Sequence, residues 1–513
     1  MSDTRGFYIT TAIPYVNAPP HLGHALELVQ ADVLARHRRL RGQPVRFLTG
    51  TDDNALKNVN AAAAAAGVDV RAFVAANAQR FADLAPVLEL SFDDFIRTSS
   101  DPRHAPGVER LWRQSAARGD FYQRAYEGLY CQGCEQFYDP DDLPEGLCPE
   151  HGVAPEPVAE HNWFFRLSAY GDKVLHALES GQVWVEPASR RNEVVSFVRN
   201  GLDDISVSRA AARAADSGIP VPGDPEQIVY VWWDALTNYI TALGYASDQP
   251  TYQSWWVDSA ERVHVIGKGI VRFHAVYWLA LLLSAGQPLP SAIFVHDYLT
   301  VNGAKLSKSA GNTVDPGEVV NRFGVDALRW WLLREVALSA DTDFTEDRLV
   351  GRYLQDLANG LGNLVNRTLS LVHKYRAGTI TDQPSAYGEC GALLQLSTDL
   401  PDRIDRALSG FDFRTATEAL WTVIDHANRL VSNERPWVLA EAERAGDIVS
   451  SDRLDAILAT LVSTCRRLAH ELTPFIPSGA ARLATQLGEG KNIGTPIPAF
   501  PRIEHATTNI DRE

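Results

Sequence analysis

The sequence predicts an α/β fold, a doubly wound parallel sheet with a metal-binding insertion, followed by an all-α bundle. Three observations indicate this fold. Short runs of β-branched and aromatic residues alternate with helical patterns over residues 1–115 and again over 226–350, which is typical of a Rossmann-like sheet. Closely spaced cysteines interrupt that alternation within residues 116–225. Long helical segments dominate residues 351–495, before a polar tail at 496–513.

The composition is that of an ordinary globular protein. The chain has 513 residues and a formal net charge of −16. It contains no apolar run of membrane-spanning length, and its N-terminus enters a strand without a signal-peptide core, so we expect a cytoplasmic protein with no membrane partner. The acidic charge repels nucleic acid overall, so any RNA contact must come from a local patch.

The first strand is expected at residues 7–13, and a helix opens at His21 after a Pro-Pro break. His21 and His24 lie one turn apart at the positively polarised start of this helix, where Gly23 leaves space beside them. This arrangement suits a bound triphosphate.

A second strand is expected at residues 45–50, and Asp52 follows its carboxyl end, where open parallel sheets bind ligands. Three later strands share a β-branched and aromatic composition and are expected at 228–233, 262–267 and 292–296. The loop after the last strand contains Lys305 and Lys308, whose ammonium groups could reach the same phosphates as the two histidines.

The insertion contains a candidate metal site. Cys131, Cys134, Cys148 and His151 form two close pairs, each with a two-residue gap. Thiolates and one imidazole in a closed tetrahedral set favour structural Zn²⁺. The alternative, unliganded cysteines beside a surface histidine, accounts less well for the matched gaps.

The C-terminal part reads as a bundle of long helices joined by short breaks. Helical periodicity is expected at residues 326–338, 348–374, 392–408, 412–433 and 451–472.

Several segments resemble a known family. In the α/β part they are His21-Leu-Gly-His24, Phe47-Leu-Thr-Gly-Thr-Asp52, residues 230–239, residues 270–274 and Lys305-Leu-Ser-Lys-Ser309. In the bundle they are residues 363–367 and Pro436-Trp437. Together these segments resemble the class I aminoacyl-tRNA synthetases, and within that class the methionyl-tRNA synthetase family.

The resemblance implies methionine–tRNA ligation. The amino-acid carboxylate would attack the α-phosphate of ATP, with Mg²⁺, to give an adenylate and pyrophosphate, and tRNA would then accept the acyl group. Charge developing on phosphates needs preorganised cations and donors, and the catalytic groups implied are His21, His24, Lys305 and Lys308. The ATP-binding residues implied are His21, Gly23, His24, Glu27, Gly267, His296 and Lys308.

By the same resemblance, Asp52 would pair with the substrate ammonium. The side-chain pocket implied comprises Ile13, Tyr15, Trp232, Ala235, Tyr239, Ile270 and His274, and such an aromatic box suits a thioether. Without the resemblance, Trp232 and Tyr239 are typical of an ordinary core.

In the bundle, Asn363, Arg367 and Trp437 would read the anticodon of tRNA. Trp437 could equally be a buried anchor at a helix start, because it follows a proline. No dimerisation module follows the bundle, so we expect a monomer.

Some positions depart from the family's pattern. The family has a Glu-His-Gly sequence where this sequence has Asp53-Asn54-Ala55. Gly269 stands where the family has an aspartate, and Asp297 stands where the family has a glycine. Two alternatives therefore stay open: a repurposed paralogue that activates another amino acid for a small acceptor, as in hydrazine-forming enzymes, and a catalytically silent tRNA-binding protein.

Overall fold

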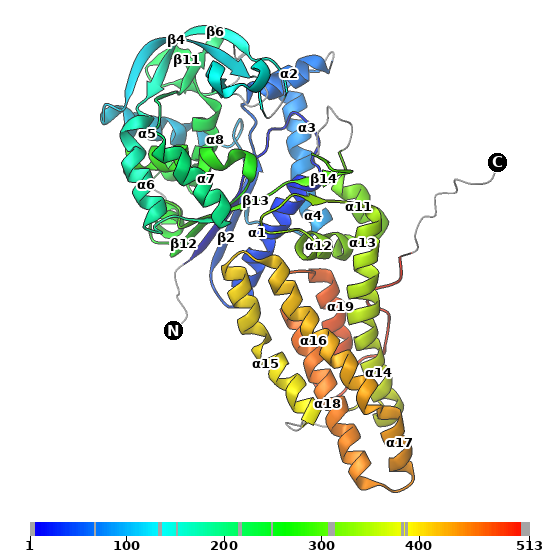
Figure 1. Cartoon of the computed structure of the whole chain (residues 1–513). Helices are drawn as coiled ribbons and strands as arrows, with labels where there is room; N and C mark the ends of the chain where they lie inside the picture. Colours follow the sequence, from blue (N-terminus) through cyan, green and yellow to red (C-terminus); the bar gives the residue numbers. More distant parts are fainter. Residues whose placement is uncertain are drawn as a thin grey trace, which may run out of the picture. The chain divides into compact units, whose positions relative to one another are not determined.

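The computed structural model describes residues 6–65, 68–131, 136–149, 152–213, 218–247, 250–305, 313–380, 384 and 388–503. The chain divides into two compact units (Figure 1). The first comprises Met1–Pro86 and Leu90–His296, and the second comprises Val87–Glu89 and Asp297–Glu513. In this division, residues 297–350 fall in the second unit.

A six-stranded sheet forms the centre of the first unit, with strand order β3-β2-β1-β12-β13-β7. Every pair of neighbours in it is parallel, which confirms the predicted α/β class. The strands are β1 (Phe7–Thr11), β2 (Val45–Thr51), β3 (Asp94–Arg97), β7 (Trp184–Glu186), β12 (Glu261–Gly267) and β13 (Ala292–His296). β7 lies inside the range expected for the insertion, yet it pairs with β13 at the sheet's edge.

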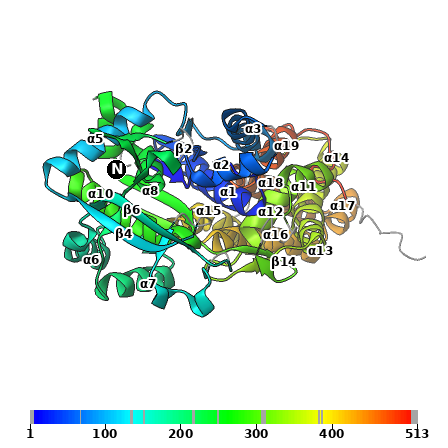
Figure 2. The same ribbon diagram turned by 90° about the horizontal axis from the view of Figure 1, so that it is seen from above.

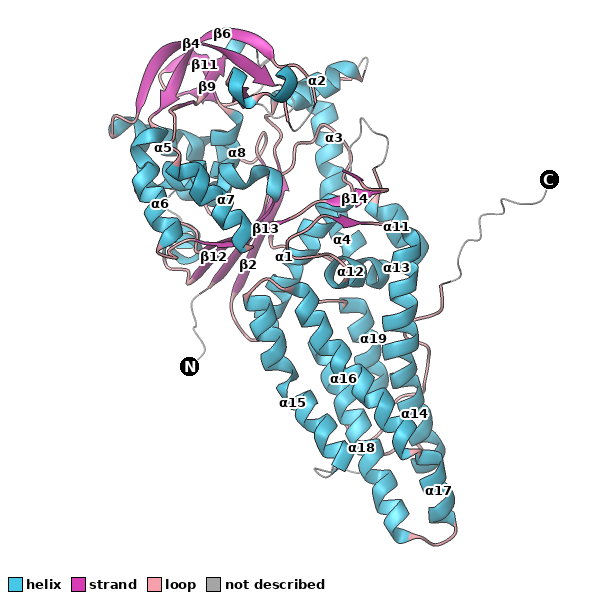
Figure 3. Cartoon of the chain, in the orientation of Figure 1, coloured by secondary structure: helices cyan, strands magenta, loops and turns pink. Residues whose placement is uncertain are grey.

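Helices cover both faces of this sheet (Figures 1 and 3). They include α1 (Leu22–Leu40), α3 (Val70–Ala82), α5 (His104–Ala117), α6 (Gly171–Glu179), α7 (Ala188–Arg199), α8 (Val231–Thr241), α10 (Trp278–Ala285) and the wider turn η8 (Phe273–Tyr277). A further helix, α2 (Leu56–Ala64), packs against α3.

Successive residues of β1 show which helix covers which face. The guanidinium of Arg38, in α1, lies 5.0 Å from the ring centroid of Phe7. The next residue, Tyr8, donates its hydroxyl to the carbonyl of Tyr239, in α8, at 2.7 Å. Because strand side chains alternate between faces, α1 and α8 cover opposite sides of the sheet.

Two antiparallel sheets lie in the insertion. One has the order β5-β4-β6-β8, and its long strands β4 (Phe121–Cys131) and β6 (Glu156–Phe165) run side by side in Figure 2. The other has the order β10-β11-β9. The remaining strands are β5 (Gln136–Tyr138), β8 (Ile205–Ser206), β9 (Ser208–Ala210), β10 (Pro220–Val221) and β11 (Asp224–Val229).

The strand expected at residues 228–233 is wrong. β11 ends at Val229 in the small sheet, and α8 begins at Val231. The aromatic and β-branched composition favours a strand locally, but Trp233 is buried among other aromatic rings of the core, and this packing outweighs the local propensity.

The second unit is mainly helical. Its helices are α11 (Pro316–Phe323), α12 (Val325–Arg334), α13 (Glu346–Arg352), η9 (Tyr353–Gly362), α14 (Asn363–Arg376), α15 (Gly388–Ser409), α16 (Phe413–Glu434), α17 (Pro436–Arg444), α18 (Ile448–Glu471) and α19 (Pro477–Leu487). The unit also contains a small sheet of three strands: β14 (Leu299–Val301) and β15 (Ala304–Lys305) precede α11, and β16 (Thr342–Asp343) lies between α12 and α13 in the sequence. Among the helices that the structure describes, none has the combined length and apolarity needed to cross a bilayer.

A buried arginine ties α12 to the loop before α19. The guanidinium of Arg329 is fully buried and donates to the carbonyls of Phe475, Leu88 and Pro474 at 2.8, 2.8 and 2.9 Å. A buried charge is tolerated when hydrogen bonds satisfy it in this way.

Candidate active site

The predicted histidine pair caps helix α1. The backbone N–H of Gly23 donates to Nδ1 of His21 at 3.1 Å, and the backbone N–H of His21 donates to Nδ1 of His24 at 3.0 Å. The two rings stack with centroids 3.9 Å apart. A ring nitrogen that accepts a hydrogen bond carries no proton, so both imidazoles are neutral and hold their proton on Nε2.

Asp52 follows β2 at the carboxyl end of the sheet, as the sequence predicts. Its backbone N–H donates to the carbonyl of Pro14 at 2.9 Å, and its carbonyl accepts from the amide of Asn58 at 2.8 Å. The side chain is 1% exposed, and its Oδ1 accepts from the backbone N–H of Asn54 at 3.3 Å. Tyr15 pairs with Asp52 through a parallel bridge, which places the predicted carboxylate beside a predicted pocket residue.

Aromatic residues from separate elements meet next to Tyr15. The rings of Tyr15 and Trp232 are 6.3 Å apart edge-to-face, and Trp232 stacks on Phe273 at 3.6 Å. The indole N–H of Trp232 is buried and has no hydrogen-bond partner in the described part of the chain. A buried donor of this kind calls for an explanation, and a ligand contact supplies one.

The far end of this aromatic group is polar but uncharged. His274 donates Nδ1–H to the carbonyl of Ile270 at 3.0 Å, so its Nε2 accepts the hydroxyl of Tyr239 at 2.7 Å. Burial lowers the pKa of His274 to about 4 and raises the pKa of Tyr239 well above its usual value. Both groups are therefore neutral near pH 7, which suits an uncharged substrate side chain.

The other predicted pocket residues lie in the same region. Ala235 is buried in α8, between Trp232 and Tyr239 in the sequence. Ile13 and Ile270 are half-buried and pack on the core cluster that includes Tyr239.

A second group of predicted residues gathers at the ends of β12 and β13. Glu27 in α1 accepts the backbone N–H of Ala12 at 2.9 Å through Oε1, and its Oε2 lies 3.0 Å from Nε2 of His296. A Cβ on Gly267 would lie 3.5 Å from Cε1 of the same imidazole. Glu27, His296 and Gly267, which the resemblance assigns to ATP binding, thus form one neighbourhood.

Other predicted residues lie elsewhere or outside the described chain. The backbone of Lys305 lies in β15 of the second unit, and Lys308 lies outside the described residues. Cys131 and Cys148 are buried in one cluster with Tyr138, whereas Cys134 and His151 lie outside the described residues.

The three residues predicted to bind tRNA all lie in the second unit. Asn363 is exposed at the start of α14, and Arg367 is half-buried one turn further on. Trp437 is 37% exposed at the start of α17, whereas the preceding Pro436 is buried. More than a third of the Trp437 surface is therefore exposed and available for stacking.

Sequence reasoning missed Phe273, His264 and the surroundings of Asp234. Phe273 precedes the predicted His274 and could have been considered for that reason. The imidazole of His264 packs 4.2 Å from the Tyr239 ring and lies 2.7 Å from the hydroxyl of Thr10, a contact across 254 positions. No local sequence pattern predicts a contact between residues so far apart in the chain.

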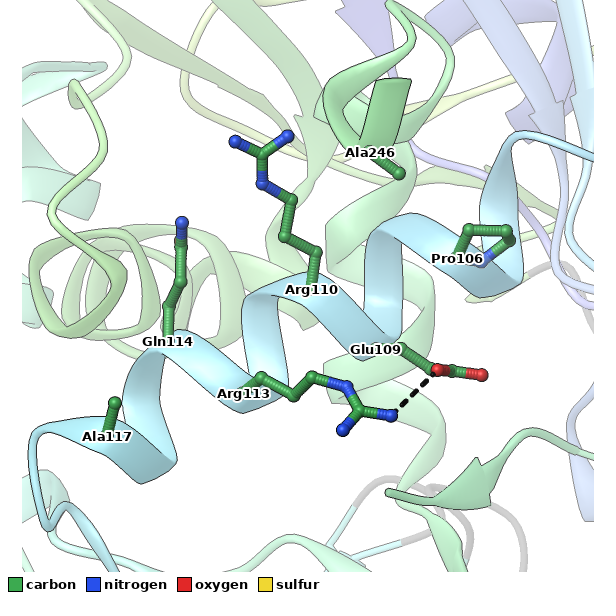
Figure 4. A pocket seen from close by; sticks show the side chains of 7 residues that line it. All are labelled: Pro106, Glu109, Arg110, Arg113, Gln114, Ala117 and Ala246. Atoms are coloured by element: carbon green, nitrogen blue, oxygen red, sulfur yellow. Dashed lines mark hydrogen bonds and ion pairs between the residues drawn. The ribbon is translucent and has the colours of Figure 1, made fainter. Parts of the chain in front are cut away.

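A depression of about 490 Å³ lies on the surface of α5 (Figure 4). It is lined by Pro106, Glu109, Arg110, Arg113, Gln114, Ala117 and Ala246. Arg113 pairs with Glu109 at 3.3 Å, and Arg110 donates to the carbonyl of Tyr245 at 2.6 Å. No predicted site residue that the structure describes lines this depression, so we assign no function to it.

Comparisons with known proteins show which family the chain is similar to. The family "tRNA synthetases class I (M)" matches residues 7–156 and 138–369. The methionine–tRNA ligase of Brucella suis biovar 1 is 40% identical over 522 residues, which cover 98% of each chain. That of Caldanaerobacter subterraneus subsp. tengcongensis is 40% identical over 493 residues, 96% of this chain and 75% of that protein. A solved structure of Mycobacterium tuberculosis methionyl-tRNA synthetase in complex with methionyl-adenylate has a TM-score of 0.91 at 39% identity, covering 97% of this chain and all of that one.

Proposed function

This chain belongs to the class I methionyl-tRNA synthetases and is a methionine–tRNA ligase, and from that premise we propose that the carboxyl edge of its parallel sheet binds methionine and ATP. The observation that carries this proposal is the convergence of an acidic group, an aromatic pocket and a capped histidine pair at that edge. Ligands bind at the corresponding edge in doubly wound sheets generally.

The amino acid is proposed to bind between Asp52 and the aromatic group. The buried carboxylate of Asp52 would pair with the ammonium, and Trp232 and Tyr239 would enclose the thioether. Contacts between sulfur and aromatic rings contribute about 0.3–1.5 kcal/mol each, and the neutral Tyr239–His274 pair avoids placing a charge against an apolar side chain.

ATP is proposed to bind at the start of α1. The Nε2–H groups of His21 and His24 would donate to its phosphates at the positive end of the helix. Glu27, Gly267 and His296 would border the nucleoside, and Lys305 and Lys308 would supply cationic charge. Mg²⁺ would neutralise part of the phosphate charge.

The chemistry then needs no protein nucleophile. The methionine carboxylate attacks the α-phosphorus, the bond to the bridging oxygen breaks, and pyrophosphate leaves with its electron pair. The terminal ribose hydroxyl of tRNA next attacks the acyl carbon. The bond between that carbon and the phosphate oxygen breaks, AMP leaves with its electron pair, and the hydroxyl proton passes to the leaving phosphate or to solvent. Fixed donors would stabilise the negative charge that develops during both transfers.

The test of the reaction is ATP–pyrophosphate exchange measured separately with each of the twenty amino acids, followed by charging of methionine tRNA. We expect exchange with methionine and charging at a comparable enzyme concentration. Exchange with another amino acid but not with methionine would contradict the proposed pocket.

Family membership removes the two alternatives, the small-acceptor paralogue and the silent tRNA-binding protein. The expected monomer and cytoplasmic location stay predictions.

The bundle is proposed to bind the anticodon through Asn363, Arg367 and Trp437. Replacing Trp437 with alanine should raise the KM for tRNA about 5- to 100-fold, because stacking of a base on an aromatic ring contributes about 1–3 kcal/mol. Methionine-dependent ATP–pyrophosphate exchange should not change. Trp184→Ala is the matched control, since Trp184 has the same 37% exposure but lies in the first unit. Equal effects of the two substitutions on tRNA charging would contradict the proposal.

The insertion is proposed to hold a structural Zn²⁺ through Cys131, Cys134, Cys148 and His151. The described half of this set fits, because Cys131 and Cys148 are both 1% exposed and belong to one cluster. Bound zinc would join the two ligand pairs and so stabilise the insertion.

Metal analysis tests the zinc site directly. The purified wild-type chain should contain about one zinc per molecule, and Cys131→Ser should lose most of it. Cys465→Ser is the control, because Cys465 is fully buried in α18 of the second unit. A Cys131→Ser variant with wild-type zinc content would rule out this ligand set.

A further inference from the structure

A buried hydrogen-bond chain lies beside the proposed methionine pocket. The amide Nδ2 of Asn54 donates to Oδ2 of Asp234 at 2.8 Å, and Nε2 of His104 lies 2.5 Å from Oδ1 of the same carboxylate. Nδ1 of His104 lies 2.8 Å from the hydroxyl of Thr241. His104 is fully buried and Asp234 is 1% exposed, so solvent cannot replace either hydrogen bond.

This series of hydrogen bonds connects the two parts of the proposed pocket, Asp52 and Trp232, that would hold opposite ends of the substrate. Asn54 comes two residues after Asp52, and its backbone N–H donates to the Asp52 carboxylate at 3.3 Å. Asp234 comes two residues after Trp232, in the first turns of α8. One residue, Asn54, therefore contacts the proposed ammonium ligand through its backbone and α8 through its side chain.

We propose that Asn54, Asp234 and His104 form a positioning bridge that sets the spacing between Asp52 and Trp232, and thereby the length of amino acid that the pocket accepts. This inference rests on the proposed function, because it takes Asp52 and Trp232 as the two ends of the methionine site. None of the three bridge residues touches the reacting atoms, so their effect is on geometry.

Helix α5 provides the fixed end of the bridge. His104 is its first residue, and Gly107 lies so close to α8 that a Cβ there would overlap Cγ2 of Thr241. The missing side chain lets the two helices approach until the imidazole of His104 reaches both Asp234 and Thr241. The contacts between α5 and α8 thus do not depend on Asn54, which joins this helix pair to the β2 loop.

Asp234 has a role that another acceptor could not fill as well. A carboxylate has two oxygens and accepts on both, so it can join the β2 loop and α5 at the same time. The neighbouring Asp53 is already bound to Arg97 at 2.9 Å and to Ser99 at 2.7 Å, so it stabilises the end of β2 and does not contact α8 in any described interaction.

A reciprocal exchange of the two side chains tests the bridge. Asn54→Asp alone brings two carboxylates together, and we expect kcat/KM for methionine at pH 8 to fall about 10- to 100-fold. The double variant Asn54→Asp/Asp234→Asn restores one donor and one acceptor in the opposite order. It also leaves an amide oxygen to accept from His104, so it should recover to within about threefold of wild type.

The selectivity for chain length separates positioning from general destabilisation. ATP–pyrophosphate exchange is measured with methionine and with ethionine, which is one methylene longer. One methylene is discriminated by about 10- to 200-fold in a well-formed pocket, and we expect Asn54→Asp to reduce this preference about tenfold while the KM for ATP stays within about twofold.

Ser284→Ala is the matched control for loss of a buried hydrogen bond. Ser284 is fully buried and donates to Asp120 at 2.7 Å. This variant should melt at a lower temperature with the methionine-to-ethionine preference unchanged. Two results would contradict the proposed bridge. One is an Asn54→Asp variant that keeps the wild-type preference for methionine over ethionine. The other is a double variant whose kcat/KM for methionine is no higher than that of Asn54→Asp.

Asp52→Asn in the same assay distinguishes failure of the bridge from failure of the proposed site. If Asp52→Asn raises the KM for methionine but Asn54→Asp changes nothing, only the bridge is wrong. If Asp52→Asn leaves the KM for methionine unchanged, the proposed ammonium site is wrong. The bridge proposal is then wrong as well, because it takes Asp52 as one end of the methionine site.

Discussion

Replacing His24 with asparagine is expected to slow adenylate formation about 10²- to 10³-fold, whereas glutamine at the same position should cost about tenfold or less. The difference follows from the cap of α1. Nδ1 of His24 accepts the backbone N–H of His21, which leaves the proton on Nε2. Asparagine can keep the cap but does not reach the Nε2 position, whereas glutamine can place an amide N–H there.

The effect should fall on kcat rather than on the KM for ATP, because the donated hydrogen bond strengthens as charge develops on the phosphates. Initial rates of ATP–pyrophosphate exchange over a range of ATP concentrations give both constants. The melting temperature of His24→Asn should stay close to that of wild type, since the cap persists. Equal losses of kcat in His24→Asn and in the glutamine variant would show that the Nε2–H group of His24 does not stabilise the transition state.

The four inner strands of the central sheet were predictable from sequence because each of them carries its own evidence. Runs such as those around Phe7 and Val295 are buried on both faces, and most of their residues are apolar or aromatic. β3 and β7 were not predicted, since they are short edge strands that contain Asp94 and Glu186. An edge strand has one neighbour only, and its local composition says little about pairing.

The candidate site was predictable only where its residues lie in local motifs. His21 and His24 are three positions apart, and Asp52 ends a recognisable strand. The contact between His104 and Asp234 spans 130 positions and depends on how α5 packs against α8. The strand wrongly expected at 228–233 has the same cause, because Trp233 is placed by its neighbours in the core rather than by its own propensity.

Replacing Asp52 with asparagine is expected to raise the KM for methionine roughly 10²- to 10⁴-fold, because removing one partner of a desolvated ion pair costs about 3–5 kcal/mol. The substitution keeps the shape of the side chain. The backbone hydrogen bonds of residue 52 to Pro14 and Asn58 do not involve the carboxylate, so the loop after β2 should keep its conformation. The KM for ATP should change little.

An analogue without the amino group identifies the lost interaction. Inhibition by 4-(methylthio)butyrate, which is methionine without its ammonium, should be about equally weak in wild type and Asp52→Asn. The wild type should therefore prefer methionine over this analogue strongly, and Asp52→Asn should have little preference. Asp53→Asn is the matched control: its carboxylate is buried against Arg97 and Ser99, so its loss should lower the melting temperature and leave the preference for the ammonium intact. If Asp52→Asn still prefers methionine as strongly as wild type does, the ammonium must be bound by another group, and the orientation of the substrate between Asp52 and Trp232 would have to be reversed.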